Sequence, residues 1–139
     1  MCIDYGTKRI GIAASDPTAT ISYPLTVIIN KGLVNNVNTL AQLSKENQIQ
    51  KLVFGLPIHY NGTEGEACNR VRELGMALSK ATLLEVDYHD ERYSSMDAEE
   101  HIKQNLGIKN PKKVVELVDK VAASMILNSY LKKEQTNGK

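Results

Sequence analysis

The order in which strand-like and helix-like patterns follow one another is the strongest constraint on the fold of this chain. Three short apolar segments come first, with a Gly-Thr turn signal between the first two, and they indicate strands that start with a hairpin. After them, helix-type spacing alternates with compact apolar runs. A hairpin followed by such alternation predicts an α/β protein with a mixed sheet flanked by helices. We expect strands at residues 1–5, 9–14, 24–30, 51–56 and 81–89. We expect one helix at residues 33–47, a second that begins near residue 63, a third from residue 94 or 95 to 106, and a fourth that begins at residue 111.

Two of these helices have recognisable start signals. Thr63 and Glu66 have the spacing of a capping box, in which two side chains satisfy N–H groups of the first turn. Asn110 is a good N-cap residue, and Pro111 then occupies the first helical position, where proline is favoured. In sheets of this kind, functional sites gather at the carboxyl ends of the strands. The residues that follow each strand are therefore the first candidates for a site.

Size and composition indicate one globular domain. The chain has 139 residues, of which 42% are hydrophobic and 24% are charged, as in an ordinary folded protein. We expect a single domain at residues 1–133 and a flexible polar tail at residues 134–139. The apolar runs are much shorter than the ~20 residues of a membrane-spanning helix. Cys2 and Cys68 have no zinc or redox spacing and follow no secretory leader, so we expect reduced thiols in a cytoplasmic protein.

Three acidic positions stand where burial disfavours a charge. In the last helix, Asp119 falls among apolar side chains at helical spacing rather than opposite them. Asp4 lies inside the opening apolar segment, and Asp90 and Glu91 end the last strand. An unpaired buried carboxylate costs several kcal/mol or becomes protonated, so these acids need partners, and one shared cation would serve. The stripe around Asp119 consists of Val115, Val118, Ala122, Ile126 and Ser129.

Adjacent acids on a strand cannot both face inward, because side chains alternate. We expect Glu91 to face the site and Asp90 to have a structural role. Carboxylate oxygens favour Mg²⁺ or Mn²⁺, whereas the histidines lack the spacing of a zinc site. The alternatives are a buried Asp119 satisfied by its own neighbours, and a surface ion-pair cluster at residues 90–92.

Candidate substrate-binding residues lie in the loops beside these acids. Lys8 and Arg9 follow the turn after the first strand, where they can balance the charge of a polyanion. Arg92 can bind a phosphate in bidentate fashion. Asn61 lies in a glycine-rich loop before a helix, where backbone N–H groups can bind an anion. The net charge of +1 argues neither for nor against binding of nucleic acid. Ordinary surface charges and turn residues would explain the same composition.

Taken together, four segments resemble the YqgF/RuvX family of bacterial RNase H-like nucleases, and the likeness spans nearly the whole chain. The resemblance implies an RNase H-like sheet of five strands with helices on both faces, and metal-dependent cleavage of nucleic acid phosphodiesters. Members are described as nucleases that process the 5′ end of pre-16S rRNA and, earlier, as Holliday junction resolvases. The matching segments are DYGTKRIG at residues 4–11 with SD at 15–16, GLP at 55–57 with NGTE at 61–64, DER at 90–92 with SS at 94–95, and DKVAA at 119–123 with IL at 126–127 and YL at 130–131.

The resemblance and the misplaced acids lead to one mechanistic hypothesis. Asp4, Glu91 and Asp119 would bind two Mg²⁺ or Mn²⁺ ions, one activating water and the other stabilising the leaving 3′ oxygen. The basic residues named above would orient the backbone of a structured rRNA precursor, or of branched DNA if the protein resolves four-way junctions. Cutting a junction symmetrically favours a dimer, whereas end trimming needs one site, so monomer and dimer both stay open.

Two other functions stay open as alternatives. Residues 4–11 also resemble the phosphate hairpin of actin-like ATPases and sugar kinases, but those enzymes close two such domains around ATP, and 139 residues hold only one. A non-catalytic nucleic-acid-binding module is the second, although all three acids are present here. Family members also carry more residues before the first acid, so we expect a short central strand.

Overall fold

The structure is a computed structural model that describes residues 1–92 and 110–137, and for residues 111–120, 136 and 137 it describes the backbone alone. The strands are β1 (Cys2–Asp4), β2 (Arg9–Ser15), β3 (Ser22–Ile29), β4 (Lys51–Leu56) and β5 (Glu85–Asp90), and the helices are α1 (Leu33–Glu46), α2 (Glu66–Thr82) and α4 (Pro111–Asn137). The sheet has five strands in the order β3-β2-β1-β4-β5. β1 pairs antiparallel with β2 and parallel with β4, β3 is antiparallel to β2, and β5 is parallel to β4. The predicted mixed sheet is confirmed.

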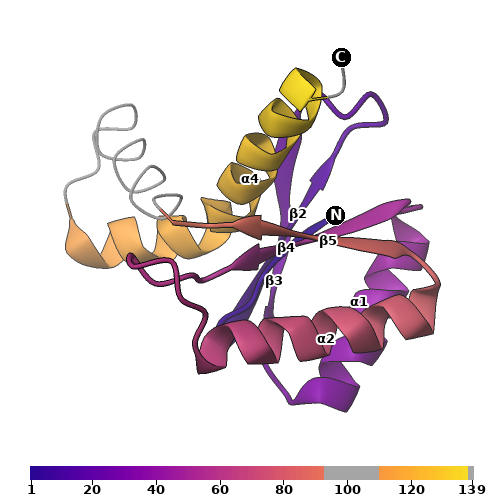
Figure 1. The fold of residues 1–139 in the computed structure, drawn as a ribbon, viewed down its shortest axis with the longest axis horizontal. Coiled ribbons are helices and arrows are strands. Elements are labelled where there is room, and N and C mark those ends of the chain that lie inside the picture. The colour runs from indigo at the N-terminus through magenta and orange to yellow at the C-terminus, as the bar shows by residue number, and fades with distance from the viewer. Residues whose placement is uncertain (93–109, 138–139) are drawn as a thin grey trace.

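Helices cover both faces of this sheet, as Figure 1 shows, with α1 and α2 on one face and α4 on the other. Each face therefore has its own apolar core. The core under α1 and α2 includes Ile3, Phe54 and Leu78, and the core under α4 includes Ala123 and Ile126. Within the described ranges, no helix is both long and apolar enough to span a bilayer.

The central strand β1 is short, as expected, and is buried on both of its faces. Cys2 belongs to the core under α4, and Ile3 to the core under α1 and α2. Because side chains alternate along a strand, Asp4 takes the α4 side and Tyr5 the opposite side, where Tyr5 packs against the larger core. The N-terminal amine donates a hydrogen bond to the Lys51 carbonyl at 2.9 Å and so ties the start of β1 to β4.

The start of α2 differs from the capping-box prediction. The N-cap is Gly65, it has no side-chain capping hydrogen bond, and the helix begins at Glu66. Thr63 instead donates its backbone N–H and its hydroxyl to Asn61 Oδ1, at 3.0 and 2.6 Å. The predicted cap is therefore wrong, because a local turn engages the threonine before the helix starts.

The boundary between α2 and β5 also differs from the prediction. α2 continues to Thr82, Leu83 ends it in a left-handed conformation with φ of 62°, and β5 begins only at Glu85. The apolar run at residues 81–84 contains no glycine or proline to mark a boundary, so periodicity alone assigned it to the strand. The helix predicted at residues 94–106 lies outside the described residues, whereas α4 begins at Pro111 as predicted.

The packing of α2 on the sheet leads to a prediction about stability. Leu78 is fully buried, so Leu78→Ala should lower the free energy of unfolding by about 2–5 kcal/mol. Met76 lies on the same helix with 62% of its surface exposed, so Met76→Ala should change it by less than about 0.5 kcal/mol. Denaturant unfolding of both variants measures the difference. Equal losses would mean that α2 does not pack through this face.

Candidate active site

Asp4 ends β1 at the same edge of the sheet where the parallel strands β4 and β5 end. The chain turns sharply after it, and a Cβ on Gly6 would lie 2.3 Å from the Arg9 carbonyl oxygen, so only glycine fits there. Asn30 fastens this turn by donating its backbone N–H to the Lys8 carbonyl and its side-chain amide to the Gly6 carbonyl, both at 2.9 Å. The sequence-based prediction missed this role of Asn30, because nothing local to it marks the contact.

Glu91 follows β5 and lies against the neighbouring strand β4. Its backbone N–H donates to the Leu56 carbonyl at 3.1 Å, which extends the parallel pairing beyond the end of β5. A Cβ on Gly55 would lie 2.3 Å from Glu91 Oε2 and 3.0 Å from Ile126 Cδ1. The absent side chain of Gly55 thus leaves the space that the Glu91 carboxyl group occupies. A glycine inside a buried strand is the signal for such a close approach, and the sequence-based prediction did not use it.

The electrostatics of Glu91 show that it meets Asp4. Burial raises the pKa of Glu91 from its ordinary value of 4.5 to about 8, and the negative charge of Asp4, a hydrogen bond with Asp4 and the charge of Asp90 act in the same direction. Glu91 Oε2 is buried and has no hydrogen-bond partner among the described residues. Two carboxyl groups this close hold a proton between them unless a cation balances their charge. The oxygen donors, the unpaired Oε2 and the space over Gly55 fit a hard cation.

Asp90 has the structural role that strand alternation predicts. Arg92 donates its backbone N–H to Asp90 Oδ1 at 2.9 Å and its Nε to Oδ2 at 2.7 Å, and the terminal nitrogen of its guanidinium group lies 2.6 Å from Oδ2. Burial alone would raise the pKa of Asp90, but these hydrogen bonds outweigh it and lower the pKa. Arg92 is thus held by Asp90 beside the candidate site.

Asp119 lies in α4, where the structure describes the backbone and not this side chain. Ala122 and Ala123 are buried in the contact between α4 and the sheet, and helical spacing puts position 119 on their side, three and four residues earlier. Among the described residues no group of three or more His, Cys, Asp and Glu side chains forms a metal site, so the meeting of Asp4 and Glu91 is what the geometry establishes.

Polar contacts fasten the other end of α4 to the sheet. Tyr130 donates its hydroxyl to Asp87 Oδ2 at 2.6 Å, and this hydrogen bond is the main reason that the pKa of Asp87 is lowered. Ser129 Oγ and His89 Nε2 lie 2.9 Å apart in a second hydrogen bond. Asp87, His89 and Glu91 alternate along one face of β5, so the contacts that hold α4 continue directly into the candidate site.

The other predicted substrate-binding residues lie at two places near the carboxyl edge of the sheet. Lys8 and Arg9 are exposed at the turn after Asp4. Asn61 is exposed in the loop between β4 and α2, where its side-chain oxygen accepts the two hydrogen bonds from Thr63 described above. The geometry therefore connects Lys8 and Arg9 to Asp4 through the turn, and gives Asn61 a structural contact within its own loop.

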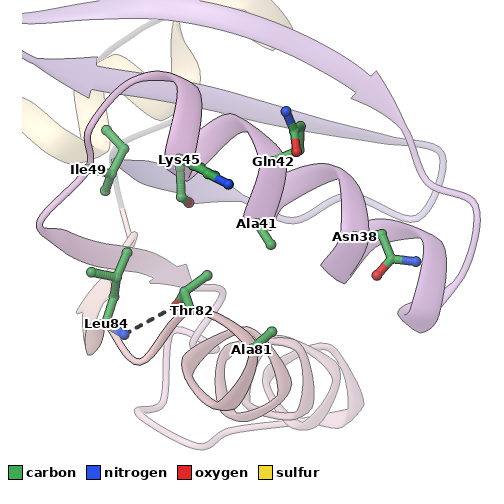
Figure 2. A pocket seen from close by; sticks show the side chains of 9 residues that line it. Asn38, Ala41, Gln42, Lys45, Ile49, Ala81, Thr82 and Leu84 are labelled. Carbon is green, nitrogen blue, oxygen red and sulfur yellow. Dashed lines mark hydrogen bonds between the residues drawn. The ribbon is translucent and has the colours of Figure 1, made fainter.

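A cavity of about 440 Å³ lies elsewhere, between the C-terminal ends of α1 and α2 (Figure 2). Asn38, Ala41 and Lys45 line it from α1, and Thr82 lines it from the end of α2. Lys45 is the single charged side chain of its lining, and the cavity is at the opposite end of the helices from Asp4 and Glu91. This cavity holds no acidic side chain among its described lining residues, whereas Asp4 and Glu91 lie at the carboxyl edge of the sheet.

Known proteins resemble this chain in both sequence and fold. A protein from Syntrophomonas wolfei subsp. wolfei named "Putative pre-16S rRNA nuclease" is 41% identical over 132 residues, covering 94% of this chain and 92% of the relative. A protein of the same name from Crocosphaera subtropica is 39% identical over 129 residues, covering 93% and 89%. Among solved structures, RuvC of T. thermophilus in complex with a Holliday junction substrate superposes with a TM-score of 0.58 at 11% identity, covering 96% of this chain and 93% of that one.

This structural likeness shows the fold, and it confirms the RNase H-like arrangement that the sequence implied. The family model described as "RuvX: Holliday junction resolvase" matches residues 1–133. The match covers both acids of the candidate site and the helix that carries Asp119. This chain therefore belongs to the RuvX family.

Proposed function

We propose that this protein is a divalent-metal-dependent nuclease that hydrolyses phosphodiester bonds in nucleic acid. The observation that carries the proposal is the half-buried pair of Asp4 and Glu91, in which the pKa of Glu91 is raised and its buried Oε2 has no hydrogen-bond partner among the described residues. A hard cation beside this pair would remove the repulsion and take up the unpaired oxygen. Membership of the RuvX family favours nucleic acid as the substrate.

Asp4, Glu91 and Asp119 are the proposed ligands of a two-ion Mg²⁺ or Mn²⁺ site. Asp4 and Glu91 come from adjacent parts of the sheet edge, and Asp119 would come from α4, one turn before the buried Ala123. When bound, such ions supply the acidity that makes water a nucleophile and the charge that stabilises a leaving oxygen in an in-line displacement.

The side chains of this protein would bind and orient the nucleic acid. Lys8 and Arg9 lie on the tight turn next to Asp4, so phosphates that they bind are held beside the acids. Asp90 fixes the orientation of Arg92, whose guanidinium group is part of the same loop as Glu91. Asn61 would contact substrate from the loop after β4. Because phosphate contacts dominate such binding, affinity should fall steeply with salt.

The best-supported substrate is the precursor of 16S rRNA, processed at its 5′ end. The relatives with 39–41% identity over most of their length are named for this substrate. A nuclease that trims an end needs a single site, and the acid pair is complete within one sheet edge of this chain. An enzyme with this role would act in the cytoplasm, where ribosomes are assembled.

Resolution of four-way DNA junctions is the second candidate, because the matching family model is described by that activity. A symmetric cut would require two copies of the site held in a fixed relation. The substrate and the oligomeric state are therefore linked, and one cleavage experiment can address both.

The first prediction concerns cleavage. Asp4→Asn, Glu91→Gln and Asp119→Asn should each lower Mg²⁺-dependent cleavage by about 100-fold or more, because each removes a proposed ligand. Glu85→Gln is the matched control, since Glu85 is an exposed acid at the opposite end of β5. Cleavage of a pre-16S rRNA fragment and of a four-way DNA junction should be measured side by side. Full activity of the Asp4 and Glu91 variants on both substrates would exclude the mechanism.

The second prediction concerns the dependence of stability on pH. Because folding raises the pKa of Glu91 from 4.5 to about 8, the folded state binds more protons than the unfolded state between these values. The metal-free protein should therefore lose stability as pH rises from about 4.5 through about 8, and Mg²⁺ should oppose the loss by stabilising the charged carboxylates. Thermal unfolding of the unmutated chain and of Glu91→Gln, with and without Mg²⁺, measures this. If stability depends on pH equally in the unmutated chain and in Glu91→Gln, this prediction is wrong.

The third prediction concerns Gly55. In Gly55→Ala the new methyl group would occupy the place of Glu91 Oε2, which is the end of a flexible side chain and can move aside. Stability should change by less than about 2 kcal/mol, whereas cleavage should fall by about 10- to 100-fold because the acid is displaced. Gly65→Ala is the control. The three atoms nearest to its new methyl group all belong to the exposed His59 side chain, which can move aside, and the closest lies at 2.7 Å. Equal activity of both variants would remove Glu91 from the site.

A further inference from the structure

A small recess opens at the carboxyl edge of the sheet, on the face opposite to Asp4 and Glu91. Its volume is about 170 Å³, and Tyr5, which directly follows Asp4, forms part of its wall. Ligand pockets for drug-sized molecules run about 300–1,000 Å³, so this recess can hold one planar ring rather than a whole nucleotide. Its full lining is Tyr5, Leu33, Asn36, Arg70, Glu73 and Leu74.

The lining combines the groups that hold an unpaired nucleobase. Tyr5 supplies an aromatic ring and Arg70 a planar guanidinium group, and both kinds of group stack on bases. The Glu73 carboxylate can accept hydrogen bonds from amino groups on a base edge. Leu33 and Leu74 add apolar walls.

Two of the polar neighbours are already accounted for by contacts in the structure. Asn36 is buried, donates its amide to Asn30 Oδ1 at 2.9 Å and accepts the Lys31 N–H at 3.0 Å, so it is a fixed part of the wall. Arg70 Nε lies 3.8 Å from Glu66 Oε1, with both side chains more than half exposed. Such a loose surface pair contributes little and leaves the guanidinium group able to turn towards a ligand.

The surface around the recess suits a polyanion. Residues 17–45, which include β3 and all of α1 except its last residue, Glu46, contain no Asp or Glu. Lys8, Arg9 and Lys31 are exposed in two segments at this edge of the sheet, which the hydrogen bond from the Asn30 N–H to the Lys8 carbonyl joins. Arg9 and its antiparallel partner Ile29, which is 66% exposed, take the α4 side of the sheet, because the neighbouring Ile10 and Ile28 pack in the core under α1 and α2. This surface is continuous with the turn that carries the proposed phosphate contacts.

We propose that the Tyr5–Arg70 recess binds an unpaired nucleobase close to the cleaved phosphate, while Lys8, Arg9 and Lys31 hold the phosphates of the same strand as it crosses the edge of the sheet. The proposal rests on the nuclease function proposed above. It adds that this protein recognises a single-stranded nucleotide next to its cutting point, through a pocket on the far face of the sheet. Stacking tolerates any base, so this site reads the absence of pairing more than the sequence.

The test combines substrate and protein variants. Cleavage is measured on substrates in which an abasic nucleotide replaces each position flanking the cut, with the unmutated chain, Arg70→Gln, Arg70→Lys and Tyr5→Leu. At one flanking position, base removal should raise KM about tenfold for the unmutated chain, with kcat largely kept. Arg70→Gln should lose most of this preference. Base removal and Arg70→Gln together should therefore raise KM little more than either change alone. Arg70→Lys, which keeps the charge and loses the planar group, should lose much of it as well.

Lys80→Gln is the matched control, because Lys80 is an exposed cation at the far end of the same helix α2. It should keep the full preference for the base. If the unmutated chain and Arg70→Gln discriminate equally between base and abasic substrates at every position, the recess does not bind the base. Binding of the same oligonucleotides, measured by fluorescence anisotropy without cleavage, gives a second readout. The binding measurement separates a recess that does not bind the base from a failure of the nuclease proposal. In the second case, the folded chain would bind the oligonucleotides and never cut them.

Discussion

The close approach of two half-buried acidic side chains, Asp4 and Glu91, is the constraint around which this fold is arranged. Like charges at such a distance oppose folding, and the raised pKa of Glu91 expresses that opposition. The surrounding structure overcomes it by pairing β1 with β4 and β4 with β5, and by leaving room over Gly55. A site of this kind is less stable empty than a site with neutral residues would be, and that unfavourable energy is what a bound cation would recover.

Residues that contradict their own surroundings were the most informative part of the sequence. Asp4 inside an apolar segment and Glu91 beside an apolar strand drew attention to two acids that interact in the structure, whereas their shared cation stays a prediction. Glycine and proline end β4 sharply, so its bounds matched, whereas no breaker separates α2 from β5 and that boundary was wrong. The close contact between Gly55 and Glu91 could not be predicted from spacing, because it depends on which strand lies next to β4 and on where the carboxyl group after that strand lies.

The position of α4 along the sheet matters more than its apolar face alone can guarantee. Apolar side chains such as Ile126 tolerate small shifts, since one hydrophobic contact can replace another. The bonds from Tyr130 to Asp87 and between Ser129 and His89 have no such freedom, because each needs one donor and one acceptor at fixed distance. They lie about three helical turns from position 119. These two bonds therefore fix the position of α4 along the sheet at this end.

In the proposed function, the sheet edge would divide two tasks of recognising nucleic acid. The α4 face holds the acids, the opposite face holds the recess beside Tyr5, and the turn at Gly6 lies between them, fastened by Asn30. Phosphates would bind at that turn through charge, whereas a base would bind in the recess by stacking on a planar group. Because neighbouring residues of one strand, Asp4 and Tyr5, point to opposite faces, a shift of β1 would disturb both tasks at once. The ladders with β2 and β4 on its two sides hold β1 in register.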